Sequence, residues 1–476
     1  MPFPTIDFAI FFGIVFVFNW LLVPFERAWK VFMILASYVF YGWWDWRFVF
    51  LLTANTALTI AGARLVSRPA RERPRRFVLA GTLAGELGLL GWFKYYGFLS
   101  VNVDNALHAL GARQLFPLLQ VTLPVGISFF TFMGLSYVID VYRRDIEPAP
   151  WLDVAVFQAF FPHLVAGPIV RGSELLPQVA GGRGRDVRRV DLSRAAYLIF
   201  GGLFKKVVLS SYLSSAIADP VFANPSRHSG PEILLATYAY AVQIYCDFSG
   251  YTDIAIGVAM LLGFRFPQNF DAPYTATSLQ DFWRRWHMTL SNWLRDYLYV
   301  PLGGNRGSRP ALYRNIVITM VLGGLWHGAA WTFVAWGAFH GVGQSIGHFR
   351  RDRRASKGVP PRANGRLAVA WQRFATFQLV CLGWVFFRAQ SLSAAMTMLR
   401  RLLTTWGPSP LLRWQVVAVV ALGIALQYVP PRFPSAVQEA FSRLSNLAQG
   451  AVLGLALLTI TTLGPAGVAP FIYYRF

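Results

Sequence analysis

The sequence predicts an all-α protein that crosses a membrane many times. Of its 476 residues, 55% are hydrophobic and only 14% are charged, and the hydrophobic residues are gathered in long blocks. The longest blocks approach the ~20 residues that a helix needs to cross ~30 Å of hydrocarbon. The arginines instead concentrate in short segments between these blocks. Together these features indicate an integral membrane protein and exclude an ordinary soluble domain.

The hydrophobic blocks predict about eleven transmembrane helices, with some re-entrant segments among them. The first block, Ile6 to Val23, has no basic segment before it. We therefore expect a membrane span there and not a cleaved signal peptide. The later blocks cover residues 31–43, 47–66, 77–96, 118–141, 152–169, 193–216, 231–263, 311–349, 367–388, 411–429 and 447–472.

The block 311–349 is too long for one regular crossing and carries repeated glycines. Glycine permits close helix packing and lets the backbone break. We therefore expect two shorter helical pieces that meet near a glycine-rich turn, with the break buried in protein. The weakly apolar stretches 170–193 and 350–366 are only loop-sized. We expect a single membrane-embedded domain over residues 1–476.

The net charge of +22 is concentrated in three arginine-rich segments, residues 64–76, 183–194 and 350–366. This is the positive-inside pattern, so we expect these segments in the cytoplasm, where they meet anionic headgroups of membrane lipids, and we expect no nucleic-acid partner. A basic loop can also attract a polyanionic donor. Cys246 and Cys381 both lie in apolar blocks. They support neither a disulfide framework nor a metal site.

One polar cluster interrupts the block 231–263. Gln243, Asp247 and Tyr251 recur every four residues and share one helical face, with Asp253 nearby. Two carboxylates within a span are rare, because a buried charge is costly unless it lines a cavity or finds a partner. They could organise a polar tunnel or form structural pairs with Lys205, Lys206 or an arginine, and the sequence leaves both readings open.

A second polar cluster runs from Asn269 to Gly304 and is dense in tryptophan and arginine. After an entry segment at 273–278, we expect an amphipathic helix that places Trp283 and His287 on one face. Such a helix usually anchors a protein at the membrane interface. An anchor explains the rings of Trp283 and Trp286 and the arginines, but it does not explain His287.

A third cluster is GGLWHGAAW, where His327 is the lone ionisable group in an apolar stretch beside Trp326. A lone histidine is more often structural than catalytic. This one lies deep in a membrane segment, and its flanking glycines are expected to leave room for a ligand. Burial would keep the imidazole neutral, as a general base near pH 7 requires.

These segments resemble the membrane-bound O-acyltransferase family, closest to its bacterial branch that contains the membrane subunit of alginate O-acetylation. The similarity runs from about residue 5 to the C-terminus, and its motifs are LPVGISFFTF, FPHLVAGPIVR, QIYCDFSGYTDIAIG, NFDAPYTATSLQDFWRRWHMTLSNWLRDYLYVPLGGNR, GGLWHGAAWTFVAWGAFHG and PFIYYRF. The resemblance implies the fold of this family, with His327 as the catalytic residue and His287 as a second active-site position. His163 stands where a variable or Gln-type residue is expected, and we do not count it as catalytic.

The resemblance also implies the chemistry. Acetyl-CoA or another acyl thioester would be the donor substrate, with no bound cofactor or metal, in the inner membrane of a bacterium. The acetyl group would reach an extracytoplasmic polysaccharide such as alginate through an SGNH-type acetyltransferase partner, or pass directly to a sugar hydroxyl. The substrate-tunnel candidates are Asp247, Tyr251, Asp253, Asn269, Trp283, Trp286 and Trp326. A transporter or flippase and a non-catalytic scaffold of an export complex remain as alternatives.

Overall fold

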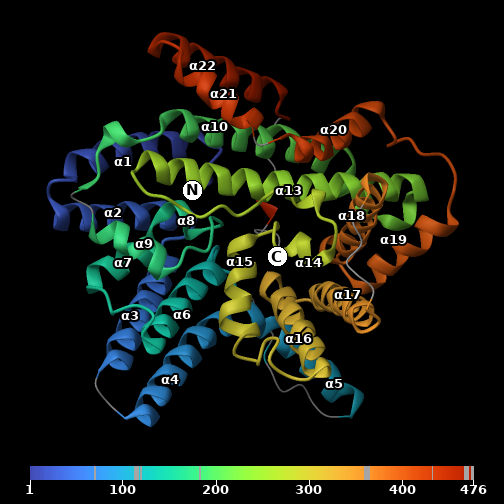
Figure 1. The fold of residues 1–476 in the computed structure, drawn as a ribbon, viewed down its shortest axis with the longest axis horizontal. Helices are drawn as coiled ribbons and strands as arrows, with labels where there is room; N and C mark the ends of the chain where they lie inside the picture. The colour runs from blue at the N-terminus through green and yellow to red at the C-terminus, as the bar shows by residue number, and fades with distance from the viewer. Residues whose placement is uncertain are drawn as a thin grey trace. The chain divides into compact units, whose positions relative to one another are not determined.

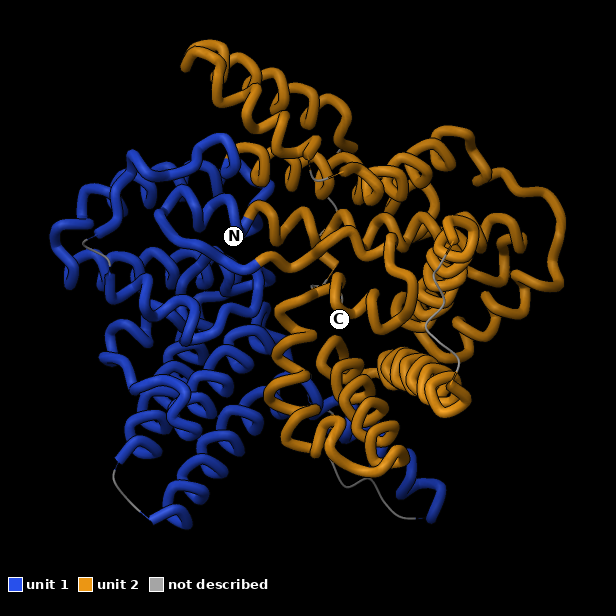
Figure 2. The backbone as a smooth tube through the Cα atoms, in the orientation of Figure 1, with its two compact units in different colours: residues 1–195, 255–267 blue, residues 196–254, 268–476 orange. Residues whose placement is uncertain are grey.

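The computed structural model describes residues 1–68, 71–111, 117, 119, 121–181, 184–358, 365–430, 432–465 and 471–472. The described residues form α-helices joined by short 3-10 and π-helical turns, and no β-strand occurs among them (Figure 1). The all-α prediction is therefore confirmed. Two compact units are present, unit 1 from residues 1–195 and 255–267 and unit 2 from residues 196–254 and 268–476 (Figure 2).

Unit 1 contains the N-terminal helices and parts of two later ones. These are α1 (Ile6–Leu22), α2 (Glu26–Gly42), α3 (Arg47–Ser67), α4 (Glu72–Leu90), α5 (Tyr96–Ala109), α6 (Ile127–Arg143), α7 (Trp151–Ala159), α8 (Phe161–Leu164), α9 (Gly172–Ala180), the start of α10 (Leu192–Leu203) and the end of α13 (Gly230–Leu261). Asn19 of α1 accepts a hydrogen bond from the Trp29 indole of α2 at 2.9 Å. It also donates to the carbonyl of Leu262 at 3.4 Å. One buried amide thus joins both ends of this unit's sequence.

Unit 2 holds the remaining parts of α10 and α13 and the helices that follow. These are α11 (Ser211–Leu213), α12 (Asp219–Ala223), α14 (Leu279–Trp283), α15 (Met288–Leu294), α16 (Arg309–His327), α17 (Trp331–Ser356), α18 (Arg366–Arg388), α19 (Leu392–Thr404), α20 (Trp414–Ala425), α21 (Arg432–Ser442) and α22 (Asn446–Leu463). The predicted break in 311–349 is confirmed, because α16 ends at His327 and α17 begins at Trp331. α16 and α17 pack against each other (Figure 1).

The close packing of α16 on α17 requires glycine at specific positions. A Cβ atom at Gly337 would clash with the backbone carbonyl of Met320, and one at Gly324 would clash with the carbonyl of Phe333. At Gly347, also on α17, a Cβ atom would meet nothing within 4 Å. Packing therefore requires glycine at position 337 of α17 but not at position 347.

We expect Gly337→Ala to destabilise the protein by about 1–3 kcal/mol, because the added methyl group pushes two backbones apart. Gly347→Ala, the matched control on the same helix, should leave stability unchanged or slightly raised, since alanine is the better helix former. Thermal unfolding of both variants in the same detergent measures the difference. Equal melting temperatures for the two variants would contradict the backbone-contact account of Gly337.

Fewer helices than expected meet the length and composition that a membrane span requires. Among the described residues, four helical stretches are long and apolar enough to cross a membrane: Arg47–Ser67, Glu72–Ala109, Leu192–Ala223 and Asn446–Leu463. A fifth is present if Trp414–Tyr428 and Arg432–Ser442, bent by 90°, form one span. The chain is thus a multi-pass membrane protein, but the expected count is not confirmed. Several hydrophobic blocks are divided into short helices, as 152–169 is into α7 and α8.

Candidate functional site

His327 is the last residue of α16, and its side chain is buried among aromatic rings of unit 2. Its imidazole centroid lies 5.0 Å from the ring of Trp326, 5.1 Å from Trp336 of α17 and 5.1 Å from Phe387 of α18. Aromatic contacts of this geometry add stability beyond the area they bury. Side chains of three helices therefore fix the position of the imidazole.

The flanking glycines do not leave the open space that the sequence suggested. A Cβ atom at Gly324 would clash with the carbonyl of Phe333, and one at Gly328 would clash with the Phe333 ring. The expectation of free room beside the histidine is therefore wrong at these two positions. The glycines let α17 turn back closely onto α16, and the first turn of α17 fills the volume.

His287 lies in a sharp turn and not within a helix. α14 ends at Trp283 and α15 begins at Met288, with His287 between them at a φ of 44°, in the left-handed region. The expected single amphipathic helix is therefore wrong, and so is the prediction that Trp283 and His287 share one helical face. A bulky residue with positive φ is uncommon and is maintained only where surrounding contacts determine it.

Asn269 supplies those contacts from outside the helix. Its backbone carbonyl accepts from the Met288 amide at 2.9 Å, and its side-chain Oδ1 accepts from the Thr289 amide at 3.2 Å and the Thr289 hydroxyl at 3.0 Å. The same Oδ1 lies 3.1 Å from Nδ1 of His287. Amides in the first turn of a helix need acceptors from outside it. Asn269 thus caps α15 and holds the imidazole in the same interaction.

The tryptophans of this segment are buried, contrary to the interfacial-anchor reading. Trp283, Trp286 and Trp293 are 8%, 2% and 7% exposed. The Trp286 ring lies 5.0 Å from that of Phe270 and 5.0 Å from that of Trp384. These rings belong to the core of unit 2, so the segment does not anchor the protein through them.

Trp326 contacts both candidate catalytic histidines. Its ring centroid lies 5.7 Å from that of His287 and 5.0 Å from that of His327. Phe248 of α13 packs edge-on against His287 at 4.7 Å. The structure thus brings together two histidines that are separated by two helices in the sequence, in one buried aromatic environment.

The acidic residues of α13 form ion pairs with the lysines that the sequence named as alternative partners. Asp247 pairs with Lys206 and also accepts the backbone amide of Ile472 at 2.8 Å, while Asp253 pairs with Lys205. Tyr251 packs against the ring of Phe471 at 4.6 Å. The structural-pairing reading is therefore supported, and a tunnel role for Asp247, Tyr251 and Asp253 stays a prediction. Residues 473–476 of the terminal motif lie outside the described residues.

His340 of α17 is a further buried histidine in this region, and the sequence analysis gave it no role. Its side chain is 0% exposed, and Nδ1 accepts a hydrogen bond from the Trp283 indole at 3.3 Å. Its ring lies 5.0 Å from that of Trp336, which in turn contacts His327. His340 lies in the glycine-rich block 311–349, but nothing in the local sequence indicates its partner, the Trp283 indole. His163, by contrast, lies in unit 1, where Nε2 is 3.0 Å from the Phe157 carbonyl.

A cavity of about 370 Å³ in unit 2 reaches Trp283. Its lining combines apolar side chains with polar and basic ones and consists of Gln280, Trp283, Arg284, Met288, Ser291, Asn292, Leu294, Arg295, Tyr299, Asn305, Ile316, Thr319, Met320, Gln344 and His348. Such a volume is in the range of small-molecule sites. Among the described residues, no cluster of three histidine, cysteine, aspartate or glutamate side chains is placed to hold a metal ion.

Asp281 stabilises the start of α14, the helix that leads into the His287 turn. Burial raises the pKa of its carboxyl, but the Thr277 amide and the Arg285 guanidinium lower it more, so the net pKa lies below the ordinary value. The carboxylate accepts from Thr277 at 3.0 Å and from Arg285 at 2.9 Å. Asp281 is therefore ionised at neutral pH and fixes Arg285 within the turn.

Comparison with known proteins shows which family the chain resembles. The family model "MBOAT, membrane-bound O-acyltransferase family" matches residues 115–387, which include both candidate catalytic histidines. The chain is similar to the probable alginate O-acetylase AlgI of Pseudomonas aeruginosa, with 40% identity over 85% of this chain and 76% of that protein. It is 34% identical to the peptidoglycan O-acetyltransferase of Helicobacter pylori, over 78% of this chain and 73% of that one. The teichoic acid D-alanyltransferase of Streptococcus thermophilus is 29% identical, over 55% of this chain and 68% of that one.

Proposed function

We propose that this chain, which belongs to the membrane-bound O-acyltransferase family, transfers an acetyl group across the inner membrane of a bacterium to an extracytoplasmic acceptor. The donor would be a cytoplasmic thioester, acetyl-CoA in the first instance. Residues 1–476 would act as one membrane-embedded catalytic domain. The observation that carries the proposal is the pair of buried histidines, His287 and His327, that contact the same tryptophan ring.

The acceptor follows from the chemistry of the relatives. The printed names of the similar proteins refer to alginate, peptidoglycan and teichoic acid, all polymers outside the cytoplasmic membrane. Two of the three names state O-acetyl transfer, and the alginate relative of Pseudomonas aeruginosa is 40% identical to this chain. A polysaccharide such as alginate is therefore the proposed final acceptor. An SGNH-type acetyltransferase would carry the acetyl group on its serine hydroxyl between the membrane protein and the polymer.

His327 would act as the general base of the transfer. Its imidazole would take the proton from the acceptor hydroxyl while the hydroxyl oxygen attacks the thioester carbonyl carbon. The carbon–sulfur bond then breaks, the new ester forms, and the thiolate leaves and takes up the proton from His327. The surrounding rings of Trp326, Trp336 and Phe387 exclude bulk water from the imidazole, which limits hydrolysis of the thioester.

His287 would position a reacting group rather than abstract the proton. Because Asn269 Oδ1 accepts from the Thr289 amide, it is an oxygen and an acceptor, so Nδ1 of a neutral His287 carries the hydrogen and donates to it. Nε2 is then the nitrogen with the lone pair. A fixed acceptor of this kind can hold an N–H group of the thioester donor or a second hydroxyl of the acceptor, since the single hydrogen of the attacking hydroxyl goes to His327.

The cavity beside Trp283 is the proposed approach for the donor. Arg284 and Arg295 supply positive charge, and Gln280, Ser291 and Asn292 supply hydrogen-bonding groups. A phosphorylated thioester carrier needs both kinds of group. Trp283 connects this cavity to His340 through the indole hydrogen bond, and His340 contacts Trp336 beside His327.

Acetyl transfer by purified protein in proteoliposomes tests the proposal. We expect radiolabelled acetyl-CoA on one side of the vesicle to acetylate polymannuronate oligosaccharides or a purified SGNH-type protein on the other side. Controls are vesicles without protein and vesicles with acetyl-CoA and acceptor on the same side. Movement of unmodified oligosaccharide without acetylation would instead establish a transporter, and neither activity with any thioester would favour a scaffold.

A further inference from the structure

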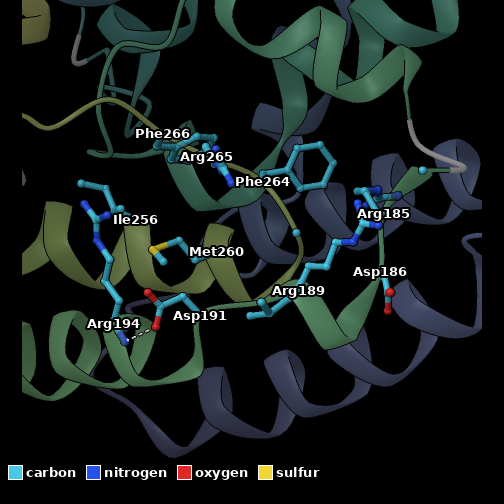
Figure 3. A pocket seen from close by; sticks show the side chains of 13 residues that line it. Arg185, Asp186, Arg189, Asp191, Arg194, Ile256, Met260, Phe264, Arg265 and Phe266 are labelled. Atoms are coloured by element: carbon cyan, nitrogen blue, oxygen red, sulfur yellow. Dashed lines mark hydrogen bonds between the residues drawn. The ribbon is translucent and has the colours of Figure 1, made fainter. Parts of the chain in front are cut away.

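A basic pocket lies in unit 1, outside the residues assigned to acyl transfer. It has a volume of about 550 Å³ and is lined by the segment 184–194, the last turns of α13 and residues 263–266 (Figure 3). Four arginines line it, Arg185, Arg189, Arg194 and Arg265, against two aspartates. The lining therefore favours an anionic ligand.

The two aspartates act within the loop and do not neutralise the arginines. Asp186 accepts the Arg188 amide at 2.9 Å, and Asp191 accepts the Arg194 amide at 2.9 Å, which caps the start of α10. Within the described part of the chain, the guanidinium groups of Arg189, Arg194 and Arg265 form no ion pair with a carboxylate. Three cations thus border one pocket with their charge available to a ligand.

Arg185 gives this pocket a rigid wall. Its guanidinium donates to the Asn19 side chain at 3.3 Å and to the Leu262 carbonyl at 3.0 Å, and it stacks over the ring of Trp29 at 4.1 Å. Desolvation by burial lowers the pKa of Arg185 to about 10, which still leaves it charged at pH 7. A stacked and hydrogen-bonded arginine is preorganised, so little side-chain entropy is lost when an anion binds.

The pocket also has an apolar side. Ile256 and Met260 of α13 and Phe264 and Phe266 beyond it contribute side chains, and Met260 lies between the arginines in the close view (Figure 3). A soluble polyanion gains nothing from such a surface. An amphiphile with a phosphate and an adjoining glycerol and acyl region gains from both parts.

We propose that this pocket binds the headgroup of an anionic phospholipid from the cytoplasmic leaflet. Arg189, Arg194 and Arg265 would hold the phosphate and the polar headgroup between them, and the glycerol end of the acyl chains would lie on Met260 and Phe266. The arginine-rich segment is expected on the cytoplasmic side, where anionic lipids attract basic groups. The bound lipid would join the segment 184–194 to the end of α13 and so stabilise unit 1.

Binding of short-chain lipids to the full chain in neutral detergent tests this assignment. We expect dioctanoyl phosphatidylglycerol to raise the melting temperature and to appear as a one-to-one adduct in native mass spectrometry, with affinity that falls as salt rises. Dioctanoyl phosphatidylcholine should bind at least about tenfold more weakly, because its headgroup carries a compensating cation. The soluble phosphate probe is adenosine 3′,5′-bisphosphate.

The variant Arg189→Gln with Arg194→Gln should lose about tenfold or more in phosphatidylglycerol affinity. The matched control is Arg188→Gln with Arg350→Gln, which removes the same charge from exposed positions that do not line the pocket. It should bind like the wild type. Equal affinity of the two double variants for phosphatidylglycerol would overturn the assignment of this pocket as the binding site. A third outcome is that the wild type binds the bisphosphate, the pocket variant does not, and phosphatidylglycerol binds no better than phosphatidylcholine. That outcome would overturn the lipid assignment and identify a soluble phosphate ligand.

Discussion

The His327→Ala variant is expected to lose acetyl transfer by about three to four orders of magnitude, because no general base remains to take the proton from the acceptor hydroxyl. The imidazole is buried among three aromatic rings, so the truncation also leaves a cavity. Some loss of melting temperature should therefore accompany the loss of activity. Activity must be expressed per amount of folded protein, measured by size-exclusion chromatography of the solubilised membrane fraction.

A second variant separates catalysis from packing at this position. His327→Gln nearly preserves the side-chain volume but cannot act as a base near neutral pH, so it should be as inactive as the alanine variant and more stable. The matched control is His163→Gln, which alters another fully buried histidine outside the proposed site. It should lose stability while each folded molecule keeps its turnover. Wild-type turnover in His327→Gln would end the general-base assignment.

The helices that could be predicted are those with a local cause. α18 spans Arg366–Arg388 where the sequence predicts 367–388, because a continuous apolar block and its flanking arginines determine it. The break between α16 and α17 follows from the glycine-rich composition of 311–349. In both cases the residues that decide the structure lie within the element itself.

The features that could not be predicted depend on distant contacts. The turn at His287 replaces a continued helix because Asn269, eighteen positions earlier, caps α15. Lys205 and Lys206 were named as possible partners of Asp247 and Asp253, but which lysine pairs with which carboxylate could not be predicted, because the pairs join residues more than 40 positions apart. Phe333 fills the space beside Gly328 only after α17 has folded back. Periodicity along the chain carries no information about any of these contacts.

The sequence predicted which residues form the candidate site better than it predicted how they are arranged. His287, His327 and Trp326 were all named from the sequence, and the structure places the three rings in contact. Their catalytic roles stay predictions, as does the tunnel. His340 was missed because a single histidine on a glycine-rich helix face gives no signal of its partner, the Trp283 indole, which lies 57 positions earlier.

The His287→Gln variant is expected to lose about 100-fold in turnover per folded molecule, the range for a positioned acid–base group. Glutamine can still hydrogen-bond, but it cannot present a ring nitrogen oriented by Asn269. The backbone at position 287 has a left-handed φ of 44°, which also disfavours glutamine, so the variant should have a lower melting temperature than the wild type. If His287 positions the acceptor, the loss should appear mainly in kcat and less in KM for the donor.

Two further variants decide whether that loss reflects the imidazole or the fold. Asn269→Ala removes both the cap of α15 and the oxygen that orients His287. If Asn269 and His287 act as one unit, the double variant Asn269→Ala with His287→Gln should have nearly the same turnover as His287→Gln alone. Phe222→Leu is the packing control, because its ring is buried in α12 against Tyr240 at 5.3 Å and lies outside the residues proposed for catalysis or substrate binding. It should lower stability and leave turnover per folded molecule near the wild-type value. A His287→Gln variant that matches Phe222→Leu in both measurements would reduce His287 to a packing residue and leave His327 as the single catalytic histidine.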